Sequence, residues 1–268
     1  VSRFDSLGSP ITERFLFSAV CWLMLTAAAL GAEALPGWGQ PVDPDGDCSF
    51  DFDGGSLTVV APGPTHSLSA ELNRMNAPRV LRPIDGDFVV DLQVNTEFTP
   101  GEQTIAQRTA YQGSGLILMK DDQTYVRLES AVLVRGGRPR FYANFELRVD
   151  GSLQRFGTPV DFALNGQGPV WLRLERRGDQ ILGAVTQEPG TYLQSKSTPL
   201  PAELQLGVAA INASSKSLVA KFSDLRVFTP HVDPPPAPLA APVGPDAVAS
   251  DVSVLPTIAP AVVETIAV

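Results

Sequence analysis

The sequence predicts an all-β fold, an antiparallel β-sandwich or barrel, and two observations support this prediction. The first is alternation, because residues 125–129 place polar side chains (Tyr125, Arg127, Glu129) on one face and apolar side chains on the other. A two-residue period in a half-polar stretch indicates a strand with one buried face. The second is spacing, because similar stretches recur with Gly and Asp turns between them, and no helical period follows the N-terminal apolar run.

The expected strands follow one another through the middle of the chain. Gly54-Gly55 and Arg177-Gly178-Asp179 are typical hairpin turns. Residues 140–149 alternate most clearly, with Phe and Leu opposite Tyr, Asn, Glu and Arg. In an antiparallel sheet, such a strand packs one face on the core and turns the other outward. The expected strands are residues 49–60 (a hairpin), 88–98, 115–120, 125–134, 140–149, 170–176, 180–187, 204–211 and 218–228.

The two ends of the chain differ from this middle region. Arg14 precedes an apolar run over residues 15–30, and Ala32-Glu33-Ala34 follows it as a cleavage site of the A-x-A kind. This pattern predicts a signal peptide over residues 1–34, with an uncleaved membrane anchor as the alternative. Residues 35–228 are the expected β-sandwich. Residues 229–268 are rich in Pro and lack Lys and Arg, so we expect a disordered tail.

Charge and location exclude several classes of partner. The net charge is −9 and the isoelectric point about 4.7. Phosphate binding needs a basic stripe, so nucleic acid is not expected as a partner. The same charge opposes adsorption to anionic lipid, so we expect no membrane contact in the mature form. The signal peptide predicts a secreted, periplasmic or cell-envelope protein.

Cysteine and histidine chemistry is sparse. Cys21 lies inside the apolar run, so Cys48 would be the one thiol left after cleavage, and it could form no intramolecular disulfide. A nucleophilic Cys48 would need His66 or His231 as its base, and His231 lies in the predicted tail. A buried, inert Cys48 is the better interpretation.

An acidic turn precedes the first strand. Asp43, Asp45 and Asp47 alternate with Pro44 and Gly46, and closely spaced carboxylates can bind calcium. The EF-hand pattern is not met, because Cys48 and Gly54 occupy its sixth and twelfth positions. Because of these carboxylates, calcium is a possible ligand of the turn; we expect no other cofactor. The favoured interpretation is a solvated turn.

Short motifs occur in a fixed order between residues 38 and 228. They are Asp43-Pro44-Asp45-Gly46-Asp47, Gly86-Asp87-Phe88, Gly115-Leu116-Ile117-Leu118, Tyr125-Val126-Arg127-Leu128-Glu129, Trp171-Leu172-Arg173-Leu174 with Arg177-Gly178-Asp179, Gly207-Val208-Ala209-Ala210, and Phe222-Ser223-Asp224-Leu225. In this order the chain resembles a bacterial family of domains of unknown function, regulation-of-enolase-like, with the concanavalin A-like lectin/glucanase jelly-roll fold. The resemblance implies a secreted or modular β-sandwich suspected of binding sugars, and no settled activity.

Glucanases of that fold carry a Glu-x-Asp-x-Glu strand, which this sequence lacks. Glu129 and Glu146 lie on predicted strands, but Arg127 and Arg148 are two residues from them, an arrangement that suits ion pairs. A glycoside hydrolase would need carboxylates from separate strands. The sequence therefore favours a non-catalytic module and leaves the hydrolase open as an alternative.

We expect the ligand to bind a polar strand face. The candidate residues share faces on three predicted strands: Tyr125, Arg127 and Glu129; Tyr142, Asn144 and Glu146, followed by Arg148; and Arg173, between Trp171 and Glu175. If these strands align in one sheet, aromatic rings can stack on a glycan while Arg and carboxylate groups bind its hydroxyls. Alternation alone also produces solvated, ion-paired faces, so a structural or partner-docking domain, with the tail as its spacer, remains the other interpretation.

Overall fold

The computed structural model describes residues 33–156, 162–187, 191–197, 200–229 and 261–262. The predicted signal peptide therefore lies outside the described residues, apart from residues 33 and 34, as does most of the predicted tail. Two of its residues form β17 (Ala261–Val262), which pairs with the end of β16 (Leu218–Thr229). Among the described residues, no helix is long and apolar enough to cross a membrane.

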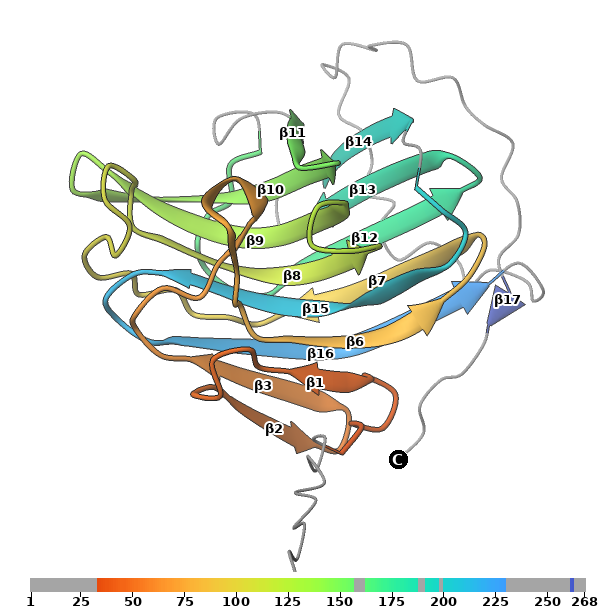
Figure 1. Ribbon diagram of the computed structural model, residues 1–268, viewed down its shortest axis with the longest axis horizontal. Helices are drawn as coiled ribbons and strands as arrows, with labels where there is room; N and C mark the ends of the chain where they lie inside the picture. The colour runs from red at the N-terminus through yellow and green to blue at the C-terminus, as the bar shows by residue number, and fades with distance from the viewer. Residues whose placement is uncertain (1–32, 157–161, 188–190, 198–199, 230–260, 263–268) are drawn as a thin grey trace, which may run out of the picture. The chain divides into compact units, whose positions relative to one another are not determined.

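The fold is an antiparallel β-sandwich, as the sequence predicts, and Figure 1 shows its strands in two layers. The seven-stranded sheet has the order β1 (Gln40–Val42), β6 (Arg79–Ile84), β15 (Leu204–Ala213), β8 (Tyr111–Met119), β9 (Tyr125–Arg135), β10 (Arg138–Val149), β11 (Ser152–Phe156). The eight-stranded sheet has the order β14 (Thr191–Ser197), β13 (Gln180–Thr186), β12 (Val170–Arg177), β7 (Phe88–Val94), β16, β3 (Ser56–Ala61), β2 (Ser49–Asp53), with β17 beside β16.

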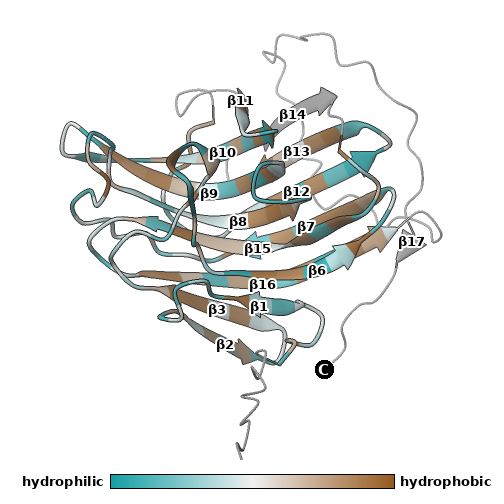
Figure 2. Ribbon diagram, viewed as in Figure 1, coloured by the Kyte–Doolittle hydropathy of each residue, from teal (hydrophilic) through white to brown (hydrophobic). Residues whose placement is uncertain are grey.

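The apolar side chains of alternate strand positions fill the space between the sheets. Val126 and Leu128 of β9 belong to this core, as do Phe145 and Leu147 of β10 and Leu172 of β12. These side chains are at most 3% exposed. The predicted alternation is therefore confirmed, and Figure 2 shows polar and apolar residues interspersed along the strands.

Strand β6 was not expected, because Arg82 and Pro83 interrupt its apolar residues. It lies between β1 and β15, but β1 pairs only with residues 79–81. Pro83 therefore lacks a neighbour on the β1 side, where its missing N–H costs no ladder hydrogen bond. Pairing with β15 continues through Pro83 opposite Gln205, so tertiary pairing overrides the local propensity.

A short excursion before β6 covers part of the outer face of the seven-stranded sheet. It contains β4 (Leu68–Ser69), the 3-10 helix η1 (Ala70–Leu72) and β5 (Arg74–Met75), and it is the orange segment that lies over the sheet in Figure 1. Leu68 packs in a second apolar cluster with Ile117, Tyr125 and Ile211. The Tyr125 hydroxyl donates to the Leu68 carbonyl at 3.0 Å. The excursion thereby forms one wall of a cleft, and the sheet face beneath it forms the floor.

Candidate functional site

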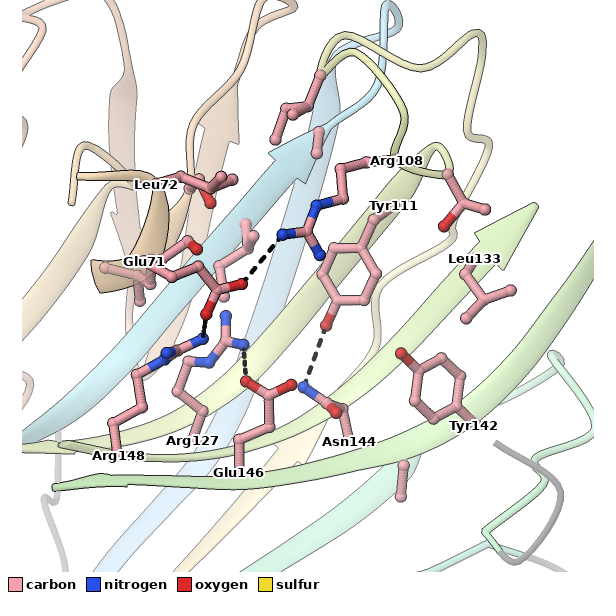
Figure 3. Close-up of a pocket in the computed structure, with 18 residues that line it drawn as sticks. Glu71, Leu72, Arg108, Tyr111, Arg127, Leu133, Tyr142, Asn144, Glu146 and Arg148 are labelled. Carbon is pink, nitrogen blue, oxygen red and sulfur yellow. Dashed lines mark hydrogen bonds and ion pairs between the residues drawn. The ribbon is translucent and has the colours of Figure 1, made fainter. Parts of the chain in front are cut away.

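A cleft of about 260 Å³ opens on the outer face of the seven-stranded sheet. Outward side chains of β8, β9 and β10 form its floor, residues 67–72 of the excursion form one wall, and residues 105–109 contribute the rim. Figure 3 shows Glu71 toward one end of the cleft and Tyr142 toward the other, with Arg108 and Tyr111 side by side between them and Asn144 and Glu146 on the strand below.

The floor of the cleft is an ion-paired network centred on Arg127. Strands β9 and β10 pair so that Arg127 lies opposite Glu146, and Glu129 lies opposite Asn144. The Arg127 guanidinium donates to Glu146, and its other terminal nitrogen lies 3.5 Å from Glu129 Oε1. The three charged side chains are at most 8% exposed. One cation therefore pairs with both buried carboxylates, as buried charges require partners, and the three groups keep a formal charge of −1 when both glutamates are ionised.

Tyr111 extends this network to β8. Its hydroxyl donates to Glu129 Oε2 at 2.5 Å, and Asn144 Nδ2 donates to the same oxygen at 3.3 Å. Gly113, two residues after Tyr111 on β8, leaves the space that this hydrogen bond needs. A Cβ at Gly113 would lie 2.6 Å from the Tyr111 hydroxyl oxygen and 2.9 Å from Glu129 Oε2. The glycine is thus required by the close approach of tyrosine and glutamate.

The wall of the cleft is joined to its floor and rim by Glu71 of η1. Its carboxylate accepts from Arg148, a floor residue whose side chain is 3% exposed, and from Arg108 on the rim at 3.4 Å. Arg148 also lies over the Tyr125 ring, 5.9 Å from its centroid, which adds a cation–π contact. Glu71 and Arg108 keep 37% and 54% of their side chains exposed, so they are the most accessible charges of the cleft.

Burial determines how these groups titrate. It raises the pKa of Glu129 despite the neighbouring Arg127. Burial alone would lower the pKa of Arg127, but Glu129 and Glu146 hold that pKa well above its usual range. Burial and then Glu129 raise the pKa of the Tyr111 hydroxyl well above its ordinary value. Tyr111 therefore keeps its proton at neutral pH and donates it in the hydrogen bond to Glu129.

The sequence-predicted face is brought together on two strands. Tyr142, Asn144, Glu146 and Arg127 line the cleft, while Tyr125 and Glu129 lie beside it in the same network. Glu71, Arg108 and Tyr111 were missed. For Tyr111 a signal exists, because Tyr111, Gly113 and Gly115 continue the period of β8 toward its N-terminal end. For Glu71 and Arg108, outside the main strands, the sequence offers none.

Arg173 lies elsewhere, which corrects the hypothesis of three aligned strands. Strand β12 belongs to the eight-stranded sheet, so Trp171, Arg173 and Glu175 do not share a face with the residues of β9 and β10. Arg173 makes a bidentate pair with Asp91 of the adjacent β7, at 2.6 and 2.7 Å. That pair satisfies the guanidinium fork, so Arg173 has a local structural partner.

The acidic turn is held by hydrogen bonds that point in different directions. Asp43 accepts from the backbone N–H groups of Gly46 and Cys48 at 3.0 and 2.8 Å, whereas Asp45 accepts from Asn76 at 2.6 Å and Asp47 from His66 at 2.9 Å. Among the described residues, Asp43, Asp45 and Asp47 do not form a common group of closely approaching ligand atoms. Their geometry is that of a capped turn and gives calcium no shared oxygen cage.

Cys48 is no activated nucleophile. It is half-buried, and its sulfur lies 3.5 Å from Asp47 Oδ1. Burial, followed by the charge of Asp43, raises the pKa of its thiol far above the usual range. Because the thiolate is the reactive form, this environment suppresses nucleophilic chemistry.

Several solved structures resemble this chain at low sequence identity. A functionally unknown protein from Saccharomyces cerevisiae matches with a TM-score of 0.56 and 14% identity, over 71% of this chain and 95% of that protein. The carbohydrate-binding module CBM66 from Bacillus subtilis matches with a TM-score of 0.39 and 9% identity, over 71% of this chain and 96% of the module. The GH43 protein BlXynB from Bacillus licheniformis matches with a TM-score of 0.45 and 12% identity, over 64% of this chain and only 32% of that protein.

The yeast protein shares the β-sandwich fold with this chain, and identities this low carry no information about a ligand. No protein-family profile matches the chain, and no curated protein sequence matches it.

Proposed function

We propose that this chain is a non-catalytic glycan-binding module whose ligand occupies the cleft over β8, β9 and β10. The observation that carries the proposal is the composition of the cleft, in which Tyr111 and Tyr142 line the same space as the accessible charges of Glu71 and Arg108, above a floor of paired charges. Sugar rings present apolar C–H faces to aromatic rings and hydroxyl groups to charged hydrogen-bonding side chains.

The size and charge of the cleft suit one neutral sugar unit. Its volume of about 260 Å³ is below the roughly 300–1,000 Å³ typical of sites for drug-sized ligands. The charged residues of the cleft and its network balance formally: Arg108, Arg127 and Arg148 against Glu71, Glu129 and Glu146. A balanced site gives an anionic or cationic ligand no net attraction, whereas hydroxyl groups can bind both signs of charge.

The network beneath the cleft also retains unused hydrogen-bonding capacity. Among the described residues, the buried side-chain atoms without a hydrogen bond are Arg79 Nε, Arg127 Nε, Arg148 Nε and Glu129 Oε1. Three of these four atoms belong to the network. Buried polar groups are normally satisfied, so this concentration is unusual for a structural network, although Glu129 Oε1 keeps its ion pair with Arg127 at 3.5 Å.

A glycoside hydrolase fits the geometry less well. A retaining enzyme needs two carboxyl groups about 5 Å apart that both reach the sugar. Glu129 and Glu146 are 1% and 3% exposed, and both are paired with Arg127. In the cleft, Glu71 is the accessible carboxylate, and it is paired with Arg108 and Arg148.

The family of the module and its location outside the cytoplasm are also part of this proposal. The resemblance to the regulation-of-enolase-like family with a concanavalin A-like jelly roll accords with a sugar-binding sandwich. A signal peptide over residues 1–34 would bring the module to extracellular or periplasmic glycans. N-terminal sequencing of the exported protein, with a start near Glu33 or Leu35 expected, would test that location.

The experiment is a glycan-array screen of the full chain beside the variants Glu71→Gln and Arg108→Gln. Both substitutions remove accessible charges and leave the contacts of Arg127 in place; circular dichroism checks the fold, above all for Glu71→Gln, which leaves the buried Arg148 with a neutral partner. We expect the wild-type protein to bind a defined group of glycans and both variants to lose signal on them. Binding by all three proteins alike would reject the cleft as the site.

A further inference from the structure

A second group of reactive side chains lies away from the cleft, where the turn before β2 meets the segment after β3. Asp47, Cys48 and His66 each offer one ligand atom, and these atoms all lie within 4.8 Å of one another. We propose that Asp47, Cys48 and His66 bind a single zinc-like transition-metal ion. This group differs from the acidic turn considered for calcium, because it supplies nitrogen and sulfur besides oxygen.

His66 is oriented as a metal ligand. Its Nδ1 lies 3.0 Å from the carbonyl oxygens of both Pro62 and Pro64, so this nitrogen carries a proton and donates. Its Nε2 points at Asp47 Oδ1, 2.9 Å away. Metal-binding histidines commonly donate one ring N–H to a backbone carbonyl, which fixes the ring and leaves the other nitrogen for the metal.

The position of His66 is fixed by the sandwich. The residue is 1% exposed. Its backbone N–H donates to the Asn212 carbonyl, and the Asn212 N–H donates back to the His66 carbonyl, both at 2.8 Å. His66 is therefore held rigidly against β15, whereas Asp47 and Cys48 approach His66 on a turn at the surface.

The spacing of the ligand atoms is close to that of a tetrahedral site. Typical zinc bond lengths to nitrogen, oxygen and sulfur place ligand atoms about 3.3 to 3.6 Å apart in a tetrahedron. Asp47 Oδ1 lies 2.9 Å from His66 Nε2 and 3.5 Å from Cys48 Sγ. All three atoms lie within 4.8 Å of one another, so a shift of the exposed turn by about an ångström or less would complete the geometry, with an ion in place of the His66 Nε2 proton.

Asp45 lies beside the group without belonging to it, and a fourth ligand from Asp45 would require the turn to move closer to His66. Asp45 Oδ2 lies 3.9 Å from His66 Nε2 and accepts from Asn76 Nδ2 at 2.6 Å. Asn76 in turn accepts from the Ser67 N–H and donates to the Thr65 carbonyl, so it is anchored on the His66 segment. Asn76 thus orients Asp45 in the way outer hydrogen bonds orient metal-binding carboxylates.

The donor atoms select the class of metal. Thiolate and imidazole favour zinc and neighbouring divalent transition metals, while calcium and magnesium require oxygen ligands. The bound ion would join the 43–48 turn to the segment after β3 and so stabilise the edge of the sandwich. The proposal does not depend on a glycan in the cleft, although Ser67 of the cleft wall directly follows His66 in the chain.

The test is metal binding by the full chain. Purified protein is dialysed with zinc, its metal content is measured, and cobalt is used as a spectroscopic probe of thiolate ligation. We expect one equivalent of zinc, a rise in melting temperature on zinc addition, and a cobalt–thiolate charge-transfer band. Cys48→Ser should remove the band and weaken zinc binding at least about tenfold, as loss of a ligand costs no less than loss of an outer-shell partner.

Cys21→Ser is the matched control, because it removes the other cysteine of the chain and should change neither band nor affinity. Asp53→Asn, an exposed carboxylate on β2, controls for general charge and should behave as wild type. Absence of tight binding by the wild-type protein, or a band that survives in Cys48→Ser, would overturn the proposal.

Discussion

The outer faces of the two sheets carry similar residues and differ in their surroundings. On the seven-stranded sheet, Arg127 and Glu146 are an ion pair across β9 and β10, with side chains 8% and 4% exposed. On the eight-stranded sheet, Arg226 and Asp224 lie two residues apart on β16, 3.4 Å from each other, and are 50% and 46% exposed. These two pairs therefore differ in burial, whereas Arg173 and Asp91 on the eight-stranded sheet, with side chains 16% and 5% exposed, are nearly as buried as the pair of β9 and β10.

The cause of this difference is a short segment and not the strands themselves. Residues 67–77 lie over β8–β10, where Leu68 accepts from Tyr125 and Glu71 pairs with Arg148. Strand alternation provides polar residues on both sheets, and the covering segment turns one part of the seven-stranded face into a cleft above a network of buried charges. Cover, more than sequence pattern, distinguishes a candidate site from an ordinary outer face.

The largest difference between the faces should appear in stability. Arg127→Met leaves Glu129 and Glu146 buried without their cation, so we expect the free energy of unfolding to fall by about 3–5 kcal/mol. Arg226→Met breaks an exposed pair and should cost about 0–1 kcal/mol. Urea unfolding of both variants measures the comparison.

A further variant sharpens that result. Adding Glu129→Gln and Glu146→Gln to Arg127→Met removes the uncompensated charges and should recover much of the lost stability. An Arg127→Met variant as stable as Arg226→Met would show that the network is solvated, and the contrast between the faces would disappear.

An effect of intermediate size is expected at Gly113. A Cβ in Gly113→Ala would lie 2.6 Å from the Tyr111 hydroxyl oxygen, which separates Tyr111 from Glu129 or shifts β8. Overpacking of this kind costs about 1–3 kcal/mol. Tyr111→Phe removes the obstructing oxygen, so the double variant should lose less stability than the sum of the single variants. Strict additivity in thermal or urea unfolding would contradict the close approach.

The smallest effect is a pH dependence that belongs to the covered face. Burial raises the pKa of Glu129 above its ordinary value of 4.5, so the folded state binds more protons than the unfolded state between the two values. Stability from this residue is therefore complete below pH 4.5 and is lost as the pH rises through the folded pKa. Relative to Glu129→Gln, the wild-type protein should become less stable with rising pH in this window. A constant difference, or one of opposite sign, in urea unfolding across this range would argue against a desolvated Glu129.

Local pattern predicts the strands well and their arrangement poorly. Alternation identifies the face shared by Arg127 and Glu146, because adjacent hairpin strands keep a register set by their turn. It cannot place β12, since the assignment of a strand to one sheet depends on packing across the whole core. Trp171 and Arg173 were therefore grouped with the wrong sheet.

The site was predictable only as far as it lies on strands. Glu71 and Arg108 come from connecting segments, whose position over β8–β10 depends on long-range contacts such as Leu68 with Tyr125. The sequence predicted this strand to begin at residue 115, whereas β8 begins at residue 111, so the prediction did not include Tyr111. Gly113 and Ser114 resemble a turn in the sequence. Pairing with β9 and β15 on both sides keeps these residues extended.

The most direct test of the central claim is a calorimetric titration of the best array glycan into a matched pair of variants. Arg108 and Arg226 are 54% and 50% exposed, each 3.4 Å from a carboxylate, but only Arg108 lies at the cleft. We predict that Arg108→Gln weakens binding at least about tenfold, about 1.4 kcal/mol, and that Arg226→Gln binds as wild type does. Equal affinity of both variants and the wild-type protein would contradict the assignment of the cleft as the glycan site.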